Sequence, residues 1–463
     1  MARMLKLKRD TTELDLLAAE GAGWRAASWN PAVARMRYGG RAEPVIEVIE
    51  ATVERASHND LAASVQALDE MAFWADGYAQ DRLMQEPVWL HAQMTNETSE
   101  RRALVRRIDY EWLTPAVSAT GYAKKNRAQM RVTIEREAYW ETTAYRGISS
   151  PTLPAGAAVL HDYTSSADIA GDVDARCSRI GVSAVVGQCD RLWLGVRSSN
   201  KIDGNAANLQ PLWECENGTN NASESGIIDV VDATASGGDY VRAREVDLNW
   251  DNEWHQVYAM HFSQATVQYL DNYGLFLWLL RARVTSGTWD TGLSFKHSSM
   301  PDAELIRKEA VEITATAWDF YEVGIQQLPI RNLQAPVAGG IDGWLEVQMW
   351  ARRTSGSGDL HLDCLALVPV DEAFLYVENM GLTGGLAPRC DIAQGPLGGQ
   401  AVLTHDIPGK IVAFGWSNGK IVLPPGDGRM VVVHAREASS VLTDQITVPI
   451  FCYERWASLR GNE

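Results

Sequence analysis

The sequence predicts a mainly β protein made of β-sandwich or jelly-roll domains, with an α+β unit at the N-terminal end. Many short segments alternate apolar and polar residues, and this period of two is typical of strands with one buried face. Turn-forming Gly, Pro, Asn and Asp separate these segments, as in antiparallel sandwiches and jelly rolls. Only residues 61–83 repeat apolar residues every three or four positions, which predicts a single amphipathic helix.

Composition narrows the class of protein. The chain has 463 residues, enough for about three domains of roughly 150 residues each. Its formal charge of −17 argues against a nucleic-acid binder, because such proteins need clustered Lys and Arg to neutralise phosphates. No run approaches the roughly 18 consecutive apolar residues of a membrane-spanning helix, so we expect no membrane insertion.

The six cysteines show no CxxC pair and no spacing typical of metal ligands. The first residues, MARMLKLKRDTTELDLL, lack the apolar core of a secretory signal. We therefore expect buried, reduced thiols in a protein made in a cytoplasm.

Residues 1–148 form the expected α+β unit. Residues 44–55 are rich in β-branched residues and apolar on both faces, which predicts a strand in a sheet that is covered on each side. Ser57 to Asp60 supply candidate N-caps for the helix at 61–83. Further strands are expected at Pro87–Met94, Arg101–Trp112 and Arg127–Trp140.

Two β regions follow a Pro- and Gly-containing linker at 149–156. Residues 157–373 contain many short alternating segments, typical of a jelly roll or carbohydrate-binding-like sandwich with large loops. Residues 374–463 form a further β region, in which Pro449 predicts an edge strand or a bulge.

The run Gly343–Glu372, GWLEVQMWARRTSGSGDLHLDCLALVPVDE, predicts a β-hairpin because a Gly- and Ser-rich turn separates two alternating segments. The polar-aromatic face of its first strand consists of Trp344, Glu346, Gln348 and Trp350. The two indoles lie about 20 Å apart along a strand and could stack on sugar rings. The alternative is that a loop or a neighbouring subunit covers them.

The carboxylates suggest few metal ligands and no catalytic residues. Asp172 and Asp174 share a DxD spacing that could hold Ca²⁺ through oxygen ligands, and Asp359 and Asp363 are further candidates. No GxSxG, HExxH, Walker A or dinucleotide-binding motif is present. A glycoside hydrolase would need two carboxylates across a cleft, and the sequence alone selects no pair. We therefore expect no cofactor other than a candidate Ca²⁺.

Several stretches resemble known proteins. LDLLAAEGAGWRAASWNPAVA, EPVWLHAQ and LPPGDGRMVVVHAR followed by VPIFCYERW resemble tail proteins of tailed phages. WLEVQMWARRTSGSGDLHLDCLALVPVDE resembles the closing strands of carbohydrate-binding jelly-roll modules. Together they cover about a third of the chain.

The resemblance implies a tail-tip component similar to siphophage distal tail (Dit-like) proteins, located in the virion and made in the host cytoplasm. It implies a belt domain at 1–148 that forms a homo-oligomeric ring, a hexamer or a trimer, with the sugar-binding-like sandwich outside. Implied partners are the tail tube, tail-tip proteins and host surface polysaccharide. The region 374–463 departs from this two-domain pattern, and it either packs back on the first domain or stands alone.

Three hypotheses about function follow. The first is a structural virion protein that links the tail tube to tip proteins, without bond-making chemistry. The second is a carbohydrate-binding adhesin or receptor-binding protein. The third is a polysaccharide depolymerase.

Overall fold

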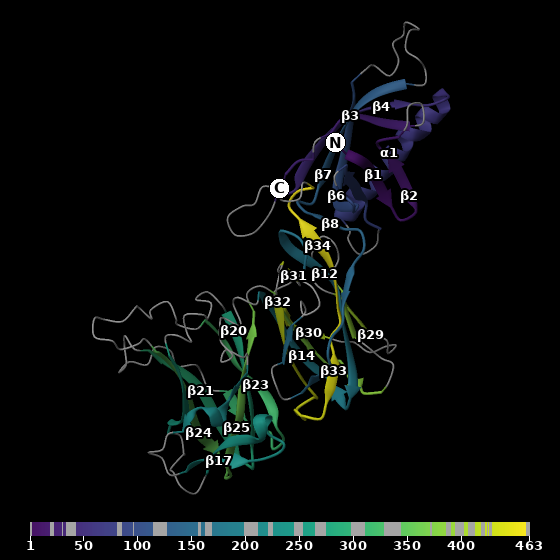
Figure 1. The fold of residues 1–463 in the computed structure, drawn as a ribbon. Helices are drawn as coiled ribbons and strands as arrows, with labels where there is room; N and C mark the ends of the chain where they lie inside the picture. The colour runs from purple at the N-terminus through teal and green to yellow at the C-terminus, as the bar shows by residue number, and fades with distance from the viewer. Residues whose placement is uncertain are drawn as a thin grey trace, which may run out of the picture.

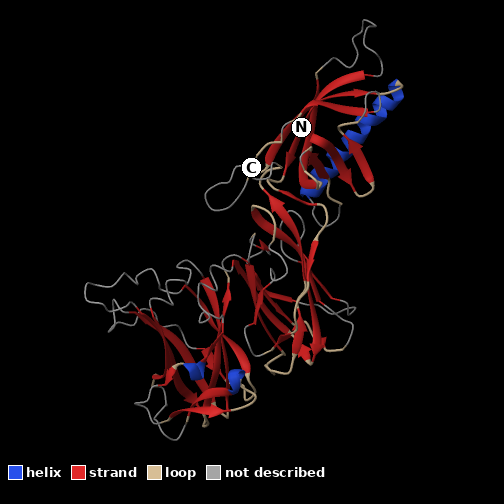
Figure 2. Ribbon diagram, in the orientation of Figure 1, coloured by secondary structure: helices blue, strands red, loops and turns tan. Residues whose placement is uncertain are grey.

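Strands dominate the computed structural model of the chain, and one long helix lies against the N-terminal sheet, as the sequence predicts (Figure 2). An N-terminal unit, a middle domain and a sandwich follow one another along an elongated molecule (Figure 1). The structure describes residues 2–18, 23–29, 31–33, 43–80, 86–95, 97–113, 127–155, 159–162, 169–198, 212–220, 226–244, 253–263, 275–297, 311–327, 344–370, 373–385, 390–393, 402–405, 413–417, 422–423, 425 and 428–459.

The N-terminal unit packs one helix against antiparallel strands. Its elements are β1 (Ala2–Arg9), β2 (Thr12–Asp15), β3 (Gly23–Ser28), β4 (Val45–Glu54), α1 (His58–Gln80), β5 (Trp89–Met94), β6 (Arg101–Trp112), β7 (Arg127–Arg136) and β8 (Trp140–Thr142). The helix begins three residues before the predicted position because the Ser57 hydroxyl caps it, accepting from the Asp60 amide at 3.2 Å. No helix among the described residues is long and apolar enough to cross a membrane.

The expectation that both faces of β4 are covered is wrong for the residues that the structure describes. Val45, Ile49 and Val53 point into the core. Ile46 and Val48, on the other face, are 60% and 49% exposed. The sequence shows which residues share a face of a strand, but whether another layer covers that face is decided by the tertiary structure.

The middle domain is built from segments on both sides of the sandwich in sequence. Its elements are β9 (Arg146–Ile148), β10 (Leu153–Pro154), β11 (Val159–Asp162), β12 (Val173–Val186), β13 (Gln188–Cys189), β14 (Arg191–Ser198), β26 (Ala373–Glu378), β27 (Leu382–Thr383), β28 (Cys390–Ala393), β29 (Val402–His405), β30 (Ala413–Ser417), β31 (Val422–Leu423), β32 (Gly428–Ala435), β33 (Gln445–Thr447) and β34 (Ile450–Trp456). One sheet has the order β11-β32-β14-β26-β30. The sheets thus join strands from both sides of the boundary that we expected at residue 373.

The C-terminal strand connects the middle domain to the N-terminal unit. Along its length β34 pairs with β12 and β9, and its last residues pair with β8. Leu459, just beyond the strand, is fully buried in the same apolar cluster as Trp140. The two parts therefore share one continuous antiparallel sheet, which makes their junction stiffer than a single linker would.

The sandwich is inserted between β14 and β26. Its elements are β15 (Leu212–Glu214), η1 (Cys215–Asn217), β16 (Thr219–Asn220), β17 (Ile227–Val231), η2 (Ser236–Gly238), β18 (Asp239–Ala243), β19 (His255–Ser263), β20 (Leu275–Val284), β21 (Thr288–His297), β22 (Val311–Ile313), β23 (Asp319–Gln327), β24 (Trp344–Ser355) and β25 (Leu360–Pro369). One sheet has the order β17-β18-β25-β20-β23, with β15 also on β25, and the other β16-β19-β24-β21-β22. Their inner faces enclose a core with Trp278, Trp289 and Phe295.

The predicted hairpin at Gly343–Glu372 is wrong. β24 pairs with β19 and β21, whereas β25 pairs with β15, β18 and β20. The connection is an arch from one sheet of the sandwich to the other. Gly356 and Gly358 have φ values of 70° and 119°, which only glycine adopts without strain. The predicted strand faces are correct, because Val347, Met349 and Ala351 enter the core.

A buried apolar contact also attaches the sandwich to the middle domain. Leu277, Leu279 and Val368 of the sandwich form one apolar cluster with Trp193 and Phe374. Polar contacts surround this cluster. The Trp193 indole N–H donates to Glu322 at 2.9 Å, and Arg191 pairs with Asp319.

Candidate functional site

The polar face of β24 is the surface that we expected to bind sugar or another subunit. A row of hydrogen bonds crosses it. The Trp350 indole N–H donates to the Ser294 hydroxyl at 2.8 Å, and the Ser294 hydroxyl donates to the side-chain oxygen (Oε1) of Gln348 at 3.2 Å. The Gln348 amide in turn donates to Glu346. The side chain of Trp344 lies outside the described residues.

This face is less open than an exposed sugar-binding platform. Gln348 is only 1% exposed and Ser294 is fully buried. Glu346 and Trp350 are half-buried. The row of hydrogen bonds holds the Gln348 amide and the Trp350 indole in fixed orientations.

The two aspartates of the DxD spacing lie near the junction with the N-terminal unit. Both Asp172 and Asp174 are exposed. One oxygen of Asp172 accepts from the Ala457 amide at 2.7 Å, so this side chain links the residue before β12 to the residue after β34. Neither aspartate belongs to a group of three candidate metal ligands among the described residues. Asp359 instead lies 4.0 Å from the Arg242 guanidinium.

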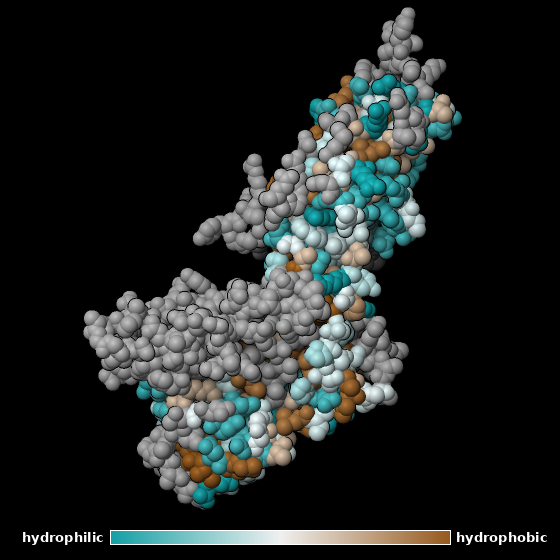
Figure 3. Space-filling model, in the orientation of Figure 1, coloured by the Kyte–Doolittle hydropathy of each residue, from teal (hydrophilic) through white to brown (hydrophobic). Residues whose placement is uncertain are grey.

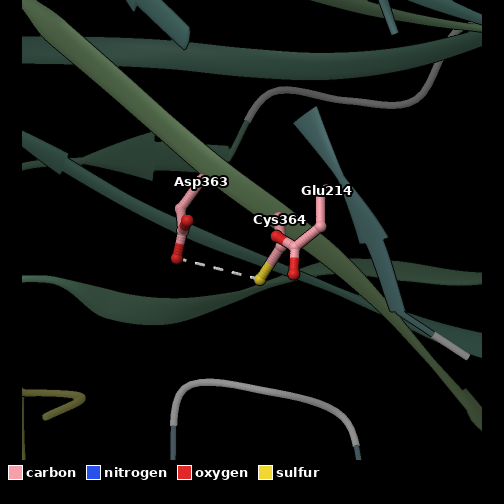
Figure 4. A group of neighbouring side chains, drawn as sticks. All are labelled: Glu214, Asp363 and Cys364. Carbon is pink, nitrogen blue, oxygen red and sulfur yellow. Dashed lines mark hydrogen bonds between the residues drawn. The ribbon is translucent and has the colours of Figure 1, made fainter. Parts of the chain in front are cut away.

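One group of three candidate ligands does occur in the described part of the chain. Glu214, Asp363 and Cys364 offer atoms within 4.8 Å of one another (Figure 4). Glu214 lies directly opposite Cys364 across β15 and β25. Asp363 joins them because it is the extra residue of a β-bulge: Arg281 pairs with Cys364 and Ala282 with Leu362, which leaves Asp363 between them.

This group fits its own arginine better than a divalent cation. One oxygen of the fully buried Asp363 accepts from Arg281, and the other accepts from the Ser236 amide at 2.9 Å. Cys364 offers sulfur, whereas Ca²⁺ takes oxygen ligands. The Arg281 guanidinium also donates to the Ser440 carbonyl at 3.0 Å, so the group helps to hold the sandwich on the middle domain.

Carboxylates outnumber cations around Arg281. Burial raises the pKa of Asp363 and of Glu216 to about 7 each. Burial also raises the pKa of Glu214, and one oxygen each of Glu214 and Glu216 is buried without a hydrogen-bond partner. A single guanidinium cannot balance three carboxylates, so this cluster takes up protons near neutral pH.

A second surface, which the sequence analysis did not single out, lies where β34 meets the N-terminal unit. It consists of three arginines and four aromatic rings in mutual contact, here called the arginine–aromatic ladder: Trp89, Arg102, Tyr453, Arg176, Tyr145, Phe451 and Arg179. Arg102 lies 4.0 Å from the ring centre of Trp89 and 4.6 Å from that of Tyr453. At the other end, Arg179 lies 4.0 Å from the Phe451 ring centre.

One buried carboxylate holds three guanidinium groups beside this ladder. Glu141 lies 2.8 Å from Arg176, 3.1 Å from Arg102 and 3.6 Å from Arg455. Burial opposes ionisation of Glu141, but the charge and hydrogen bonds of Arg176, with the charges of the other two arginines, outweigh it and lower the pKa. This group of Glu141 and three arginines, here called the Glu141 node, lies next to the exposed ring of Tyr145, and Glu137 adds a second negative charge near Arg455.

Sequence reasoning missed the ladder because its members come from five separate segments. Only Phe451 and Tyr453 gave a local signal, since alternation places both on one face of the last strand. Gly147 leaves room for the Phe451 ring, which lies 3.5 Å from the position that a side chain would take there. No spacing in the sequence connects these residues to Trp89 or Arg102.

The cysteines that the structure describes contribute no side chain to the polar face of β24 or to the arginine–aromatic ladder. Cys177, Cys189, Cys215, Cys364 and Cys452 are buried and form no disulfide among the described residues. Burial raises the pKa of Cys452 to about 12, and thiols of this kind react slowly. The side chain of Cys390 lies outside the described residues.

Fold and sites together define a class: a mainly β protein in which one helix-bearing unit, a middle domain and an inserted sandwich are joined by buried contacts. No protein-family model and no curated protein matches the chain.

Among solved structures, the chain is similar to the SPP1 Dit protein, described as a paradigm of the hub adsorption apparatus in phages infecting Gram-positive bacteria (8% identity, TM-score 0.24, 97% of this chain and 99% of that one). It is also similar to a chain of the phage P2 baseplate in its activated conformation with Ca (9%, 0.22, 97% and 98%). A third match is infectious bursal disease virus, Gt strain (9%, 0.18, 82% and 87%). Likenesses at these TM-scores establish neither a family nor a role for this chain.

Proposed function

We propose that the chain is a structural subunit of a phage tail tip, a ring-forming protein that links the tail tube to tip proteins without bond-making chemistry. The sequence resemblance of its first 148 residues and its last strands supports this proposal. So does the stiffness of the molecule, in which one sheet runs from the N-terminal unit into the middle domain. A protein that passes position and force from one neighbouring protein to the next needs stiff junctions between its domains more than it needs a ligand-binding cleft.

The observation that carries the proposal is the distribution of exposed apolar side chains. Six of the twelve large exposed hydrophobic residues among those described belong to the N-terminal unit: Val33, Ile46, Val48, Phe73, Trp112 and Leu113. Exposed aromatic and aliphatic side chains are typical of surfaces that other subunits cover when they lie together, as Ile46 and Val48 do on one face of β4. The N-terminal unit, which makes up most of the region that the resemblance assigns to the ring, therefore carries half of these exposed side chains, and Tyr145 near the end of that region is a seventh.

Electron microscopy of the purified full-length chain, combined with mass photometry, tests the proposal. We expect closed rings of three or six subunits, since a closed ring requires a heterologous contact with the right rotation. A protein that stays monomeric at every concentration measured contradicts the proposed function.

The alternative is a glycan-binding protein, and the β24 face favours it. Trp350 offers a half-buried indole held in place by Ser294, beside the Glu346 carboxylate. The experiment is a glycan array probed with the wild type and with Trp350→Ala. Binding that Trp350→Ala abolishes supports this alternative, and a wild type that binds nothing on a broad array contradicts it.

A further inference from the structure

The outer face of α1 is acidic and carries one exposed aromatic ring. Phe73 is 67% exposed. Asp69, Glu70 and Asp76 lie three or four positions from it, hence on the same face of the helix, and all are exposed. The helix contains no Lys or Arg, and the side of the N-terminal unit that carries it is largely hydrophilic (Figure 3).

These three carboxylates make neutral hydrogen bonds. Asp69 accepts from the Tyr110 hydroxyl at 2.6 Å, Glu70 from Gln66 at 3.2 Å and Asp76 from Gln80 at 3.1 Å. None of them forms an ion pair with another described residue. An exposed phenyl ring among uncompensated negative charges suits a partner surface that is both aromatic and cationic.

The arginine–aromatic ladder is such a surface on the same chain. Tyr145 is 58% exposed at its centre, and its ring contacts Phe451 and Tyr453 at centroid distances of 5.5 and 6.4 Å. Arg179 adds a cation at one end, and the node at Glu141 supplies positive charge behind the rings. These arginines and exposed aromatic rings contrast with the net charge of −17 of the whole chain.

The two surfaces face in opposite directions. α1 packs on the core face of β6, where Ala103 and Val105 share an apolar cluster with Leu68. Arg102 alternates with these residues and projects from the other face, as Trp89 does on β5. A contact between the helix face of one copy and the ladder of another is therefore heterologous, and repeating it produces a ring or a filament.

We propose that the acidic face of α1, centred on Phe73, docks on the arginine–aromatic ladder of the next copy. This inference rests on the proposed ring function and names the two surfaces that make the ring. The Phe73 ring packs against Tyr145 and Phe451, while Glu70 and Asp76 meet the positive charge at the ladder. Because exposed charges are screened by salt, raising the ionic strength weakens the contact.

Two double variants of the full chain test this contact. Phe73→Ala with Glu70→Lys alters the helix face, and Tyr145→Ala with Arg179→Ala alters the ladder. Truncating an aromatic and a charged anchor of one interface commonly weakens it by about 30-fold or more. Mass photometry is expected to show that each variant alone is monomeric at concentrations where the wild type forms rings. Circular dichroism checks that both are folded.

Mixing the two variants gives the decisive result. Each copy then keeps one native surface, so an equimolar mixture is expected to form heterodimers and nothing larger. The matched control, Asp109→Lys, makes the same charge change at an exposed carboxylate on β6 and is expected to assemble like the wild type.

Three outcomes overturn the inference or its premise. Rings formed by either double variant show that other surfaces make the ring, while the proposed function stands. A mixture that remains monomeric shows that the two surfaces do not meet each other. A monomeric wild type contradicts the ring itself.

Discussion

At the residue scale, two Arg–Glu pairs on the same two strands of the N-terminal unit have different surroundings. Arg136 and Glu47 are 0% and 1% exposed, and the guanidinium also donates to the carbonyls of Ala32 and Ala138. The nearby pair of Arg131 and Glu50, on the same two strands, lies in solvent at 41% and 49% exposure. One Arg–Glu pair is therefore buried, and the other is exposed to solvent.

Glu47→Gln is expected to destabilise the N-terminal unit by about 3–5 kcal/mol, because it leaves the Arg136 charge buried without a counter-ion. Glu50→Gln, the matched control, is expected to change stability far less, because solvent screens that pair. Urea unfolding followed by tryptophan fluorescence measures both. Equal losses from the two variants would contradict the assignment of the buried pair.

The pH dependence of stability tests the carboxylate cluster of the sandwich. Burial raises the pKa of Glu216 from its ordinary 4.5 to about 7. A raised carboxyl pKa contributes stability that is fully present below pH 4.5 and is lost as the pH rises through 7. Relative to Glu216→Gln, which does not titrate, the wild type should therefore lose about 1–3 kcal/mol between pH 5 and pH 8.

Denaturant unfolding of both proteins at several pH values measures this difference. Glu312→Gln removes an exposed carboxylate from the same sandwich and serves as the control. A constant difference between the wild type and Glu216→Gln across this range would rule out the shifted titration.

At the scale of elements, the alternation of apolar and polar residues predicted which residues share a face of a strand, but not which strands pair. Val347, Met349 and Ala351 were expected on one face and lie in the core, yet their strand pairs with β19 and β21 and not with β25. Local spacing determines which side chains point the same way. Hydrogen-bonded partners lie far away in the chain, as Ala366 of β25 and Leu212 of β15 do, and a Gly- and Ser-rich connection suits an arch as well as a hairpin.

Gly195 on β14 lies where the middle domain closely approaches the sandwich. A Cβ atom there would lie 2.2 Å from the carbonyl oxygen of Pro369 at the end of β25. Gly147 on β9 provides a contrast, since a Cβ atom there would make an ordinary 3.5 Å contact with the Phe451 ring. Both glycines lie in strands, but only Gly195 lies at a contact between two domains.

Gly195→Ala is expected to push β25 away from β14 and to cost about 2 kcal/mol or more, the usual penalty of overpacking. Gly147→Ala should change stability by less than about 0.5 kcal/mol. Hydrogen exchange should show lost protection along β14 and β25 in the first variant alone. Unchanged protection there would mean that the interface does not depend on this contact.

At the scale of the whole molecule, the sandwich is an insertion whose ends lie side by side. Val196 of β14 is directly opposite Ala373 of β26. Strands in this relation can be closed by a two-residue turn. The N-terminal unit and middle domain, by contrast, are held together by the last strand of the chain and cannot be separated by a cut in sequence.

Replacing residues 197–372 with Asn-Gly is therefore expected to leave a folded protein, provided that Val431→Thr and Val433→Thr make the uncovered face polar. Both valines are now fully buried against the sandwich. Circular dichroism and thermal melting measure folding, and mass photometry shows whether assembly survives, as the proposed function requires. The same deletion without the threonines is expected to aggregate, and an unfolded product of the threonine version would contradict the insertion.

The sequence by itself determined the mainly β class, the single helix and the residues that face the cores, because these depend on local periodicity. It also placed Glu346, Gln348 and Trp350 on one face of a strand. Only the tertiary structure decided the partners of β24 and β25, the split middle domain, the bulge at Asp363 and the arginine–aromatic ladder. Each of these brings together residues far apart in the chain, and their proximity follows from sheet pairing and core packing, which no local pattern encodes.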